Sequence, residues 1–193
     1  MTADAWLATL APLVDEGALL LIGPGAPDPL PPAAIRRHVP PGTLIPLAEG
    51  ARLANPDRPV VIVGGDADLY GLQLGDLLHA VRRNATVVCI VADNGLAAGT
   101  AATAGAGQYP LMPLLLALAA GSTFVAQGLS NKRLLRLADL AFHHPGFALV
   151  NVLERPFDPS GMHILDGEWE HDEFDQVSAM EWAANPDRVA TGV

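Results

Sequence analysis

The sequence predicts an α/β fold in which helices cover both faces of a doubly wound, mostly parallel sheet. Short apolar runs without polar alternation, such as Val60-Val61-Ile62-Val63, recur along the chain, and segments with apolar residues at helical spacing lie between them. Strands with no polar face are typical of parallel sheets that are covered on both sides. A chain of 193 residues, 50% of them hydrophobic and 17% charged, is long enough for one domain with a substantial core.

The expected elements alternate between helix and strand. Trp6, Leu10 and Leu13 share one face of the first helix, and an apolar run bounded by glycines follows it as a strand. After the second strand, Leu77 and Val81 mark the buried face of a helix that ends in basic residues, which suit a helix C-terminus. In order, we expect helix 6–14, strand 18–22, helix 47–53, strand 60–63, a helix from 74 to near 82–84, strand 86–92, helix 112–120, strand 123–127, a helix capped by Ser130 that contains 134–141, and strand 148–153.

Two segments are expected to be loops. The segment 23–41 holds too many prolines for long regular structure, although 33–37 has room for a turn or two of helix, and 95–110 consists mainly of small residues. Beyond Pro156 the composition turns acidic, before a short helix with apolar residues on one face. We therefore divide the chain into an α/β domain, 1–156, and an acidic C-terminal extension, 157–193, that packs on the domain or on a partner.

Composition and charge exclude several classes of protein. A net charge of −10 argues against nucleic-acid and anionic membrane partners, because their phosphates would be repelled. The single cysteine, Cys89, excludes an internal disulfide and lies in an apolar run, so we expect it to be buried. The start of the chain lacks the pattern of a signal peptide, and no apolar run is long enough to span a bilayer. The expected location is the cytoplasm.

Polar side chains follow two neighbouring strands at the point where each strand ends. Gly64-Gly65-Asp66-Ala67-Asp68 comes after the strand at 60–63, and Asp93-Asn94 comes after the strand at 86–92. The spacing suits one helix and one strand, and the carboxyl ends of parallel strands meet at one edge of a sheet. A carboxylate oxygen of Asp66 and an amide oxygen of Asn94 could therefore hold one Mg²⁺ and, through it, a diphosphate.

Each half of this pattern also has a purely structural interpretation. Asp66 could cap the helix after a tight glycine turn, and Asn94 with Gly95 could form an ordinary turn. The glycine segment could also be a dinucleotide-binding turn, although the order Gly-x-Gly-x-x-Gly is missing. The residues alone leave these alternatives open.

Several segments, in order along the chain, resemble one family. They are LIPLAEGARLANP at 44–56 followed by the Gly-Gly-Asp turn, LLHAVRRN at 77–84, IVADN at 90–94, LLLALAAGSTFVA at 114–126, HPGFALVNVL at 144–153, HD at 171–172 and RVATGV at 188–193. Together they resemble the β subunit of the 2-oxoacid:ferredoxin oxidoreductases. The matches lie on distinct expected elements and favour ligand binding over the structural interpretations of the two strand ends.

The resemblance implies a thiamine diphosphate-binding fold that holds the diphosphate half of the cofactor together with Mg²⁺. The implied metal ligands are the side chains of Asp66 and Asn94 and the backbone carbonyl of Leu96. The implied cofactor-binding residues are Gly65, Asp66, Ala67, Asp68, Asn94, Leu96 and Thr100. Ala67 replaces the last glycine of the family motif, which is a mild change if its φ is negative and a strained one otherwise.

Thiamine chemistry also needs a carboxylate at the aminopyrimidine ring of the cofactor. In this family that glutamate belongs to a different domain, so the resemblance implies a companion subunit with a pyrimidine-binding domain, and we assign no catalytic acid or base to this chain. The implied reaction is decarboxylation of a 2-oxoacid, with oxidation or transfer of the enamine intermediate. The implied assembly is a hetero-oligomer. The implied substrate is a 2-oxoacid, and coenzyme A is an optional second substrate.

The chain also departs from the family. Gly23-Pro24-Gly25-Ala26 stands where cluster-binding subunits have Cys-Pro-Gly-Cys, and one cysteine cannot hold a conventional iron–sulfur cluster, so we expect none in this chain. Pro41-Gly42-Thr43 replaces a His-Gly-Arg pattern, and 97–103 keeps only Thr100 of the polar groups in Tyr-Gly-x-Thr-Gly-Gly-Gln. These losses weaken the expectation of substrate and coenzyme A contacts, whereas the metal positions are intact.

The favoured interpretation is a catalytic thiamine diphosphate- and Mg²⁺-binding subunit of a 2-oxoacid oxidoreductase-like complex. Two alternatives keep the fold: a non-catalytic scaffold subunit, suggested by the bare loop at 97–103, and a subunit of a non-oxidative thiamine diphosphate-dependent decarboxylase. A nucleotide-binding module unrelated to thiamine is a further alternative, and it would bind a dinucleotide without Mg²⁺.

Overall fold

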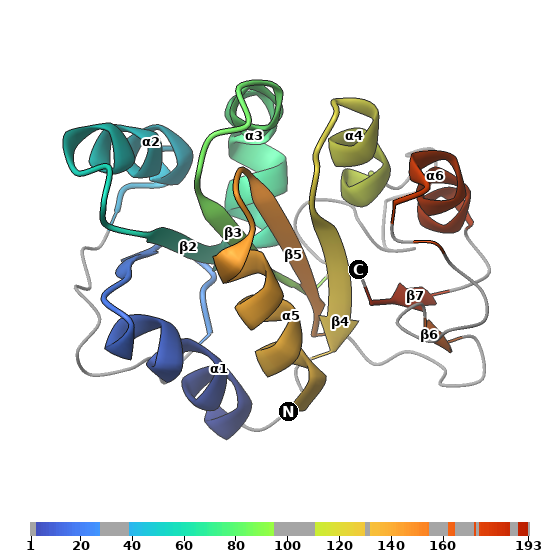
Figure 1. Ribbon diagram of the computed structural model, residues 1–193, viewed down its shortest axis with the longest axis horizontal. Coiled ribbons are helices and arrows are strands. Elements are labelled where there is room, and N and C mark those ends of the chain that lie inside the picture. Colours follow the sequence, from blue (N-terminus) through green and yellow to red (C-terminus); the bar gives the residue numbers. More distant parts are fainter. Residues whose placement is uncertain are drawn as a thin grey trace.

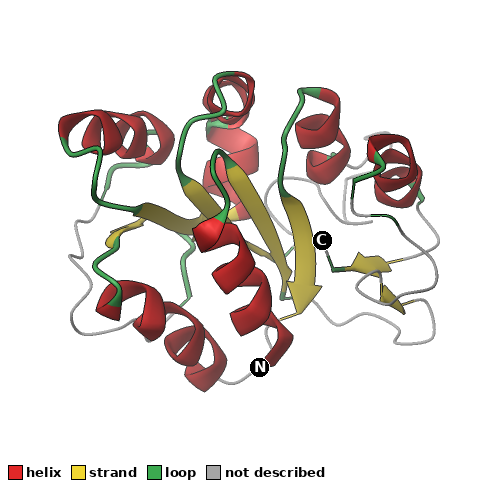
Figure 2. Cartoon of the chain, viewed as in Figure 1, coloured by secondary structure: helices red, strands yellow, loops and turns green. Residues whose placement is uncertain are grey.

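A computed structural model of the protein describes residues 3–27, 39–94, 111–129, 132–154, 162–164, 172, 174–185 and 189–192. The predicted α/β fold is confirmed, since a parallel five-stranded sheet in the order β1-β2-β3-β5-β4 has helices on both faces (Figure 2). Its strands are β1 (Leu19–Ile22), β2 (Val60–Gly65), β3 (Val88–Asp93), β4 (Val125–Leu129) and β5 (Ala148–Leu153). The flanking helices are α1 (Ala3–Asp15), α2 (Leu44–Ala54), α3 (Leu74–Arg82), α4 (Pro113–Ala119) and α5 (Lys132–His143).

The strand order explains which helices cover which face. From β1 to β2, from β2 to β3 and from β3 to β4 the chain moves in one direction across the sheet, and from β4 to β5 it returns. Because crossovers between parallel strands are right-handed, α2, α3 and α4 lie on one face and α5 lies on the other. α1 packs against α5, so these two helices cover the second face together (Figure 1).

The core consists of two apolar layers, one on each face of the sheet. Trp6, Leu10 and the apolar face of α5 fill the layer under α1 and α5, and residues of α2, α3 and α4 fill the other. Successive residues of one strand alternate between the layers, since Ile90 of β3 belongs to the first and Cys89 and Val91 belong to the second. Both faces of the strands are therefore apolar, which is why the sequence shows no polar alternation.

Some element boundaries differ from those predicted. α2 begins at Leu44, three residues before the expected start, and β4 begins at Val125. A π-helix, η1 (Ala67–Leu72), is separated from β2 by Asp66 alone, and it was not predicted. π-helical turns are frequent at functional sites. The predicted short helix at 33–37, the loop at 95–110 and the cap Ser130 lie outside the described residues.

Elements beyond residue 156 lie beside β4 and α4 (Figure 1). The strands β6 (Met162–Ile164) and β7 (Val189–Thr191) pair in parallel, and the helix α6 (Gln176–Ala184) contacts α4. The backbones of Gly192 and Gln127 exchange two hydrogen bonds of 2.8 and 2.9 Å as an antiparallel bridge on the outer edge of β4. The side chain of Gln176 donates to the Leu118 carbonyl oxygen over 2.9 Å. The domain division at residue 156 stays a prediction.

No helix in the described part of the chain combines the length and the apolar character that crossing a membrane requires.

Candidate functional site

The end of β2 touches the loop that follows β1. The Gly65 N–H donates to the Pro24 carbonyl oxygen over 2.8 Å. A Cβ atom at Gly65 would lie 3.0 Å from the Cα atom of Gly25, which is closer than carbon atoms normally pack. A side chain at Gly65 would therefore push the two backbones apart, and glycine lets the two loops meet at the carboxyl edge of the sheet.

Asp66 follows β2 and precedes η1. Its side chain is 1% exposed and makes no capping hydrogen bond to η1, so it does not act as a helix cap. Its Oδ2 atom is buried and accepts no hydrogen bond from the described part of the chain, although the residue has other interactions. Ala67 lies inside η1, and among the described non-glycine residues the one positive φ belongs to Asn84. The replacement of glycine by Ala67 therefore causes no backbone strain.

The Asp68 carboxylate, which is also buried, connects η1 to the segment before α2. Its Oδ1 atom accepts from the Gly42 N–H over 2.7 Å, and its Oδ2 atom accepts from the Gln73 side chain over 2.9 Å. Gln73 in turn accepts from the Ile45 N–H over 2.9 Å, in the first turn of α2. Asp68 thus holds loop backbone in place, and its predicted contact with a cofactor stays a prediction.

The register of β2 and β3 brings the two predicted metal-binding side chains to one edge. Gly65 pairs with Ala92, so Asp66 and Asp93 occupy corresponding positions directly after this pair, and Asn94 comes one residue later. Neighbouring strands lie about 4.8 Å apart. Asp93 is buried, whereas Asn94 is exposed. Asp66 and Asn94 therefore lie on adjacent strand ends, as the sequence predicted, and their roles as metal ligands remain predictions.

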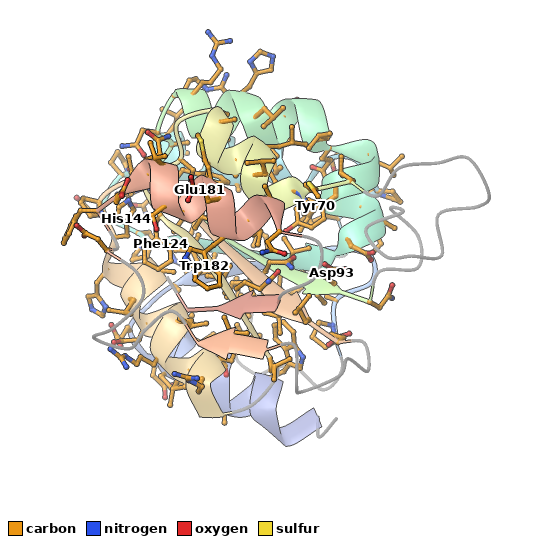
Figure 3. All side chains as sticks on the ribbon, turned by 90° about the vertical axis from the view of Figure 1, so that its right-hand side faces the viewer. Tyr70, Asp93, Phe124, His144, Glu181 and Trp182 are labelled. Atoms are coloured by element: carbon orange, nitrogen blue, oxygen red, sulfur yellow. The ribbon has the colours of Figure 1, made fainter. Side chains whose placement is uncertain are left out.

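A buried polar layer that the sequence reasoning missed lies beside this edge. The Tyr70 hydroxyl donates to Asn151 Oδ1 over 2.8 Å, and Asn151 Nδ2 donates to Asp93 Oδ2 over 3.1 Å and to Gln127 Oε1 over 3.0 Å. Tyr70 and Asp93 lie at the same end of the sheet (Figure 3). The signal in the sequence is Asn151 itself, a polar residue in the middle of the apolar run 148–153.

Glu154 adds a third carboxylate at this edge. Its N–H donates to the Asp93 carbonyl oxygen over 2.9 Å, and its Oε1 atom accepts from the Trp6 indole N–H over 3.0 Å. Partial burial raises the pKa of the Glu154 carboxyl, the Trp6 hydrogen bond opposes this shift, and the negative charges of Asp66 and Asp93 add to it. The edge therefore combines three carboxyl groups, those of Asp66, Asp93 and Glu154.

The raised pKa of Glu154 predicts how its replacement changes stability with pH. Between its ordinary pKa of 4.5 and the raised value, the folded state holds a proton that the unfolded state loses, so Glu154 reduces stability as the pH rises through this window. Glu154→Gln keeps an acceptor for Trp6 and removes this loss. In metal-free buffer, we expect the variant to melt at a higher temperature than the wild type at pH 7, with a difference that shrinks below pH 4.5.

Thermal unfolding between pH 3 and pH 8, followed by circular dichroism, measures this difference (the range brackets the usual carboxyl pKa values). Glu181→Gln, on the exposed face of α6, is the matched control and should show no such trend. A Glu154→Gln variant that is less stable than the wild type throughout the window would contradict the prediction.

Some predicted features lie elsewhere or outside the described residues. Leu96 and Thr100 are outside them, so their predicted roles stay predictions. In the described ranges, no three His, Cys, Asp or Glu side chains gather in a way that could hold a metal ion. The predicted magnesium site needs no such group, since only Asp66 among its ligands is of these types. Cys89 is buried in β3, and burial raises the pKa of its thiol, so it is an inert core residue.

The sequence has relatives that agree with this architecture. Residues 31–152 match the family described as thiamine pyrophosphate enzyme, C-terminal TPP binding domain. The chain is 38% identical over 130 residues to the β subunit of a 2-oxoacid:ferredoxin oxidoreductase from a Sulfolobus species, which covers 58% of this chain and 43% of the relative. It is 36% identical over 145 residues to subunit β of 2-oxoacid:ferredoxin oxidoreductase 2 from Aeropyrum pernix, which covers 66% of this chain and 46% of the relative. The matched regions span less than half the length of these relatives.

The fold is also similar to that of a solved structure. A 2-oxoglutarate:ferredoxin oxidoreductase from Magnetococcus marinus, with 2-oxoglutarate, coenzyme A and succinyl-CoA bound, superposes with a TM-score of 0.81 at 24% sequence identity. The superposition covers 98% of this chain and 77% of that one. At this level of identity the similarity establishes the fold.

The predicted resemblance to the β subunits is confirmed by these relatives, which carry that description. The family match, 31–152, covers β2 and β3, which Asp66 and Asn94 follow, and it extends over more than half of the chain. The chain therefore belongs to the thiamine pyrophosphate enzyme family as a C-terminal TPP-binding domain, of the kind found in β subunits of 2-oxoacid:ferredoxin oxidoreductases.

Proposed function

We propose that this chain binds the diphosphate of thiamine diphosphate through Mg²⁺ at the carboxyl ends of β2 and β3, as one subunit of a 2-oxoacid oxidoreductase complex. The observation that carries the proposal is the register that puts Asp66 and Asn94 on adjacent strand ends. Asp66 is buried there without capping the helix that follows, so a structural role as a cap does not account for it.

The chemistry of the residues at this edge fits a magnesium ion. Mg²⁺ takes about six oxygen ligands and usually binds one or two protein carboxylates together with phosphate oxygens and water. Asp66 supplies the carboxylate, Asn94 an amide oxygen and Leu96 a backbone carbonyl. The neighbouring carboxyl groups of Asp93 and Glu154 add to the acidic character of this edge, and a divalent cation would offset it before a diphosphate approaches.

The backbone supplies the remaining contacts. Gly65 has no side chain, and its N–H is bonded to the Pro24 carbonyl oxygen. The Ala67 N–H, at the start of η1, is the backbone donor beside which the diphosphate would lie. Asp68 supports this turn through Gly42 and Gln73. Thr100 supplies a hydroxyl from the segment after Asn94. Bound thiamine diphosphate supplies an electron-accepting ring for decarboxylation of a 2-oxoacid.

The proposed assembly is based on the relatives, which are named as β subunits. The glutamate that contacts the aminopyrimidine ring would come from a companion subunit with a pyrimidine-binding domain, and the 2-oxoacid, with or without coenzyme A, would bind between the subunits. Cys89 is the single cysteine of the chain, so electrons from an oxidative reaction would leave through another subunit. We place this complex in the cytoplasm, and we assign residues 1–156 to the cofactor domain and 157–193 to an extension that packs on it or on the companion.

Calorimetric titration of thiamine diphosphate into the purified full chain tests the proposal. We expect saturable heat in excess Mg²⁺, loss of that heat in excess chelator, and its return when Mg²⁺ is restored. Thiamine without the diphosphate is the matched ligand control, and it should give no heat that depends on Mg²⁺, because the metal is bound through the diphosphate.

Three outcomes would redirect the assignment. Equal binding in Mg²⁺ and in chelator would remove the metal from the site. No binding under either condition, with the companion subunit present, would make the chain a scaffold. Binding of a dinucleotide without Mg²⁺ would identify a nucleotide-binding module.

A further inference from the structure

The polar layer of Tyr70, Asp93, Gln127 and Asn151 crosses three neighbouring strands. Asn151 of β5 pairs in register with Gln127 of β4 on one side and with Val91 of β3 on the other. Asp93 lies two residues beyond Val91, and side chains two residues apart in a strand share a face. The three strand residues therefore project on the side of the sheet that α3 and α4 cover, and Tyr70 reaches them from η1.

The direction of each hydrogen bond in this layer is fixed. Burial raises the pKa of the Tyr70 hydroxyl well above its usual range, so the hydroxyl keeps its proton and donates to Asn151 Oδ1. The amide nitrogen of Asn151 must then face the other way, where its two protons reach Asp93 Oδ2 and Gln127 Oε1. Asn151 is 1% exposed, so a replacement that removed either of these two donated hydrogen bonds would be costly here.

Asp93 lies between the rest of this layer and the predicted metal site, and it contacts the layer through its side chain. It is the last residue of β3, its side chain is held by Asn151 and its carbonyl oxygen accepts from the Glu154 N–H. Asn94, the next residue, leaves the sheet from this fixed point and is exposed at the edge. The direction in which Asn94 leaves β3 therefore depends on how Asp93 is held.

We propose that Asn151 is a positioning residue for the magnesium site: its amide holds Asp93 at the end of β3 and thereby aligns Asn94 beside Asp66. This inference rests on the proposed function, since it concerns the same metal site. Residues that hold or orient metal ligands typically change the metal affinity by about ten- to a hundredfold when they are replaced.

Asn151→Asp tests the inference with a side chain of nearly the same shape. It keeps the acceptor for Tyr70 but replaces the amide group that donates to Asp93 with a carboxyl group, so the amide N–H that holds Asp93 is lost. At saturating thiamine diphosphate, we expect the Mg²⁺ concentration for half-maximal binding to rise by about ten- to a hundredfold. Asn55→Asp, an exposed residue after α2, makes the same chemical change and should leave that concentration unchanged.

A double exchange separates positioning from general damage. Combining Asn151→Asp with Asp93→Asn restores one carboxylate and one amide with their places reversed, and Gln127 can turn its own amide to donate. We expect the Mg²⁺ requirement to return to within about threefold of wild type, because neighbouring residues that share a hydrogen bond do not act additively. Thermal unfolding of each ligand-free variant reports purely structural effects separately. Tyr70→Phe removes one donor without adding charge, and it provides the test if Asn151→Asp does not fold; we expect a several-fold rise.

The possible failures are distinguishable. If the wild type binds no thiamine diphosphate in Mg²⁺ with the companion subunit present, the proposed function fails, and this inference fails with it. If the wild type binds normally and Asn151→Asp loses thermal stability but keeps its Mg²⁺ requirement, Asn151 is only structural and the inference alone is overturned. If Asn151→Asp does not fold, and Tyr70→Phe folds with an unchanged Mg²⁺ requirement, the inference is also overturned.

Discussion

Replacing Asp66 by alanine is expected to abolish the Mg²⁺-dependent binding of thiamine diphosphate. Asp66 is the single carboxylate in the proposed ligand set, and it is 1% exposed at the end of β2. Mg²⁺ depends on one or two such carboxylates, and loss of a direct ligand should exceed the effect of losing a more distant partner, so the affinity should fall by about a hundredfold or more. Calorimetric titration of thiamine diphosphate into both proteins in excess Mg²⁺ measures the difference.

Two further variants make this result interpretable. Asp57→Ala removes an equal charge from an exposed turn and should bind the cofactor as the wild type does. Asp66→Asn keeps the shape of the buried side chain, so its circular dichroism and melting curve show whether a loss of binding reflects a loss of folding. Equal heats from the wild type and from a folded Asp66→Ala would remove Asp66 from the metal site.

The largest effect on stability is expected at Trp6. Its side chain is fully buried between α1 and the sheet, where it packs with Leu10 and the apolar face of α5, and its indole N–H donates to Glu154. Trp6→Ala leaves a large cavity in that layer and should lower the free energy of unfolding by about 3–5 kcal/mol. Equilibrium denaturation in urea, monitored by far-ultraviolet circular dichroism, measures this loss.

Trp6→Phe serves as the matched comparison. It fills most of the cavity but cannot donate to Glu154. The stability that it loses therefore measures the hydrogen bond and a small remaining void, apart from the main contribution of apolar packing. We expect a loss of about 1–2 kcal/mol, which reflects one hydrogen bond to a partly exposed acid and a small void. If Trp6→Ala were as stable as Trp6→Phe, α1 would contribute little to the core, contrary to its position.

Much of the fold could be predicted because the decisive signals are local. The run Val60-Val61-Ile62-Val63 forms the buried strand β2, as an apolar segment without alternation predicts for a parallel sheet. The spacing of Leu77 and Val81 gives the buried face of α3. Boundaries follow less closely from local spacing, since α2 begins earlier than expected and Asp66 alone separates η1 from β2. At the end of η1 the Gln73 N–H donates to the carbonyl oxygen of Asp68, five residues earlier. The spacing of apolar residues in the sequence does not predict this π-helical hydrogen bond.

The candidate site was only partly predictable, for a related reason. The sequence placed Asp66 and Asn94 at the ends of adjacent strands, because in this fold strand ends meet at one edge. It did not reveal that Asp68 is bonded to Gly42 and Gln73, nor that Asn151 contacts Tyr70 across the sheet. The contacts of Asp68 with Gly42 and of Asn151 with Tyr70 join residues far apart in the chain, so the three-dimensional fold decides them. The contact of Asp68 with Gln73 is local, and it depends on the unpredicted π-helix η1.

The bridge between Gln127 and Gly192 has a consequence for assembly. β4 is the last strand of the five, and the outer side of such a strand is normally open to pairing with a foreign strand. Here the chain's own returning segment uses the backbone groups of Gln127 on that side. Any companion that sought to extend the sheet at β4 would first have to displace residues 189–192, so docking of another subunit at this border should proceed through side chains and not by strand addition.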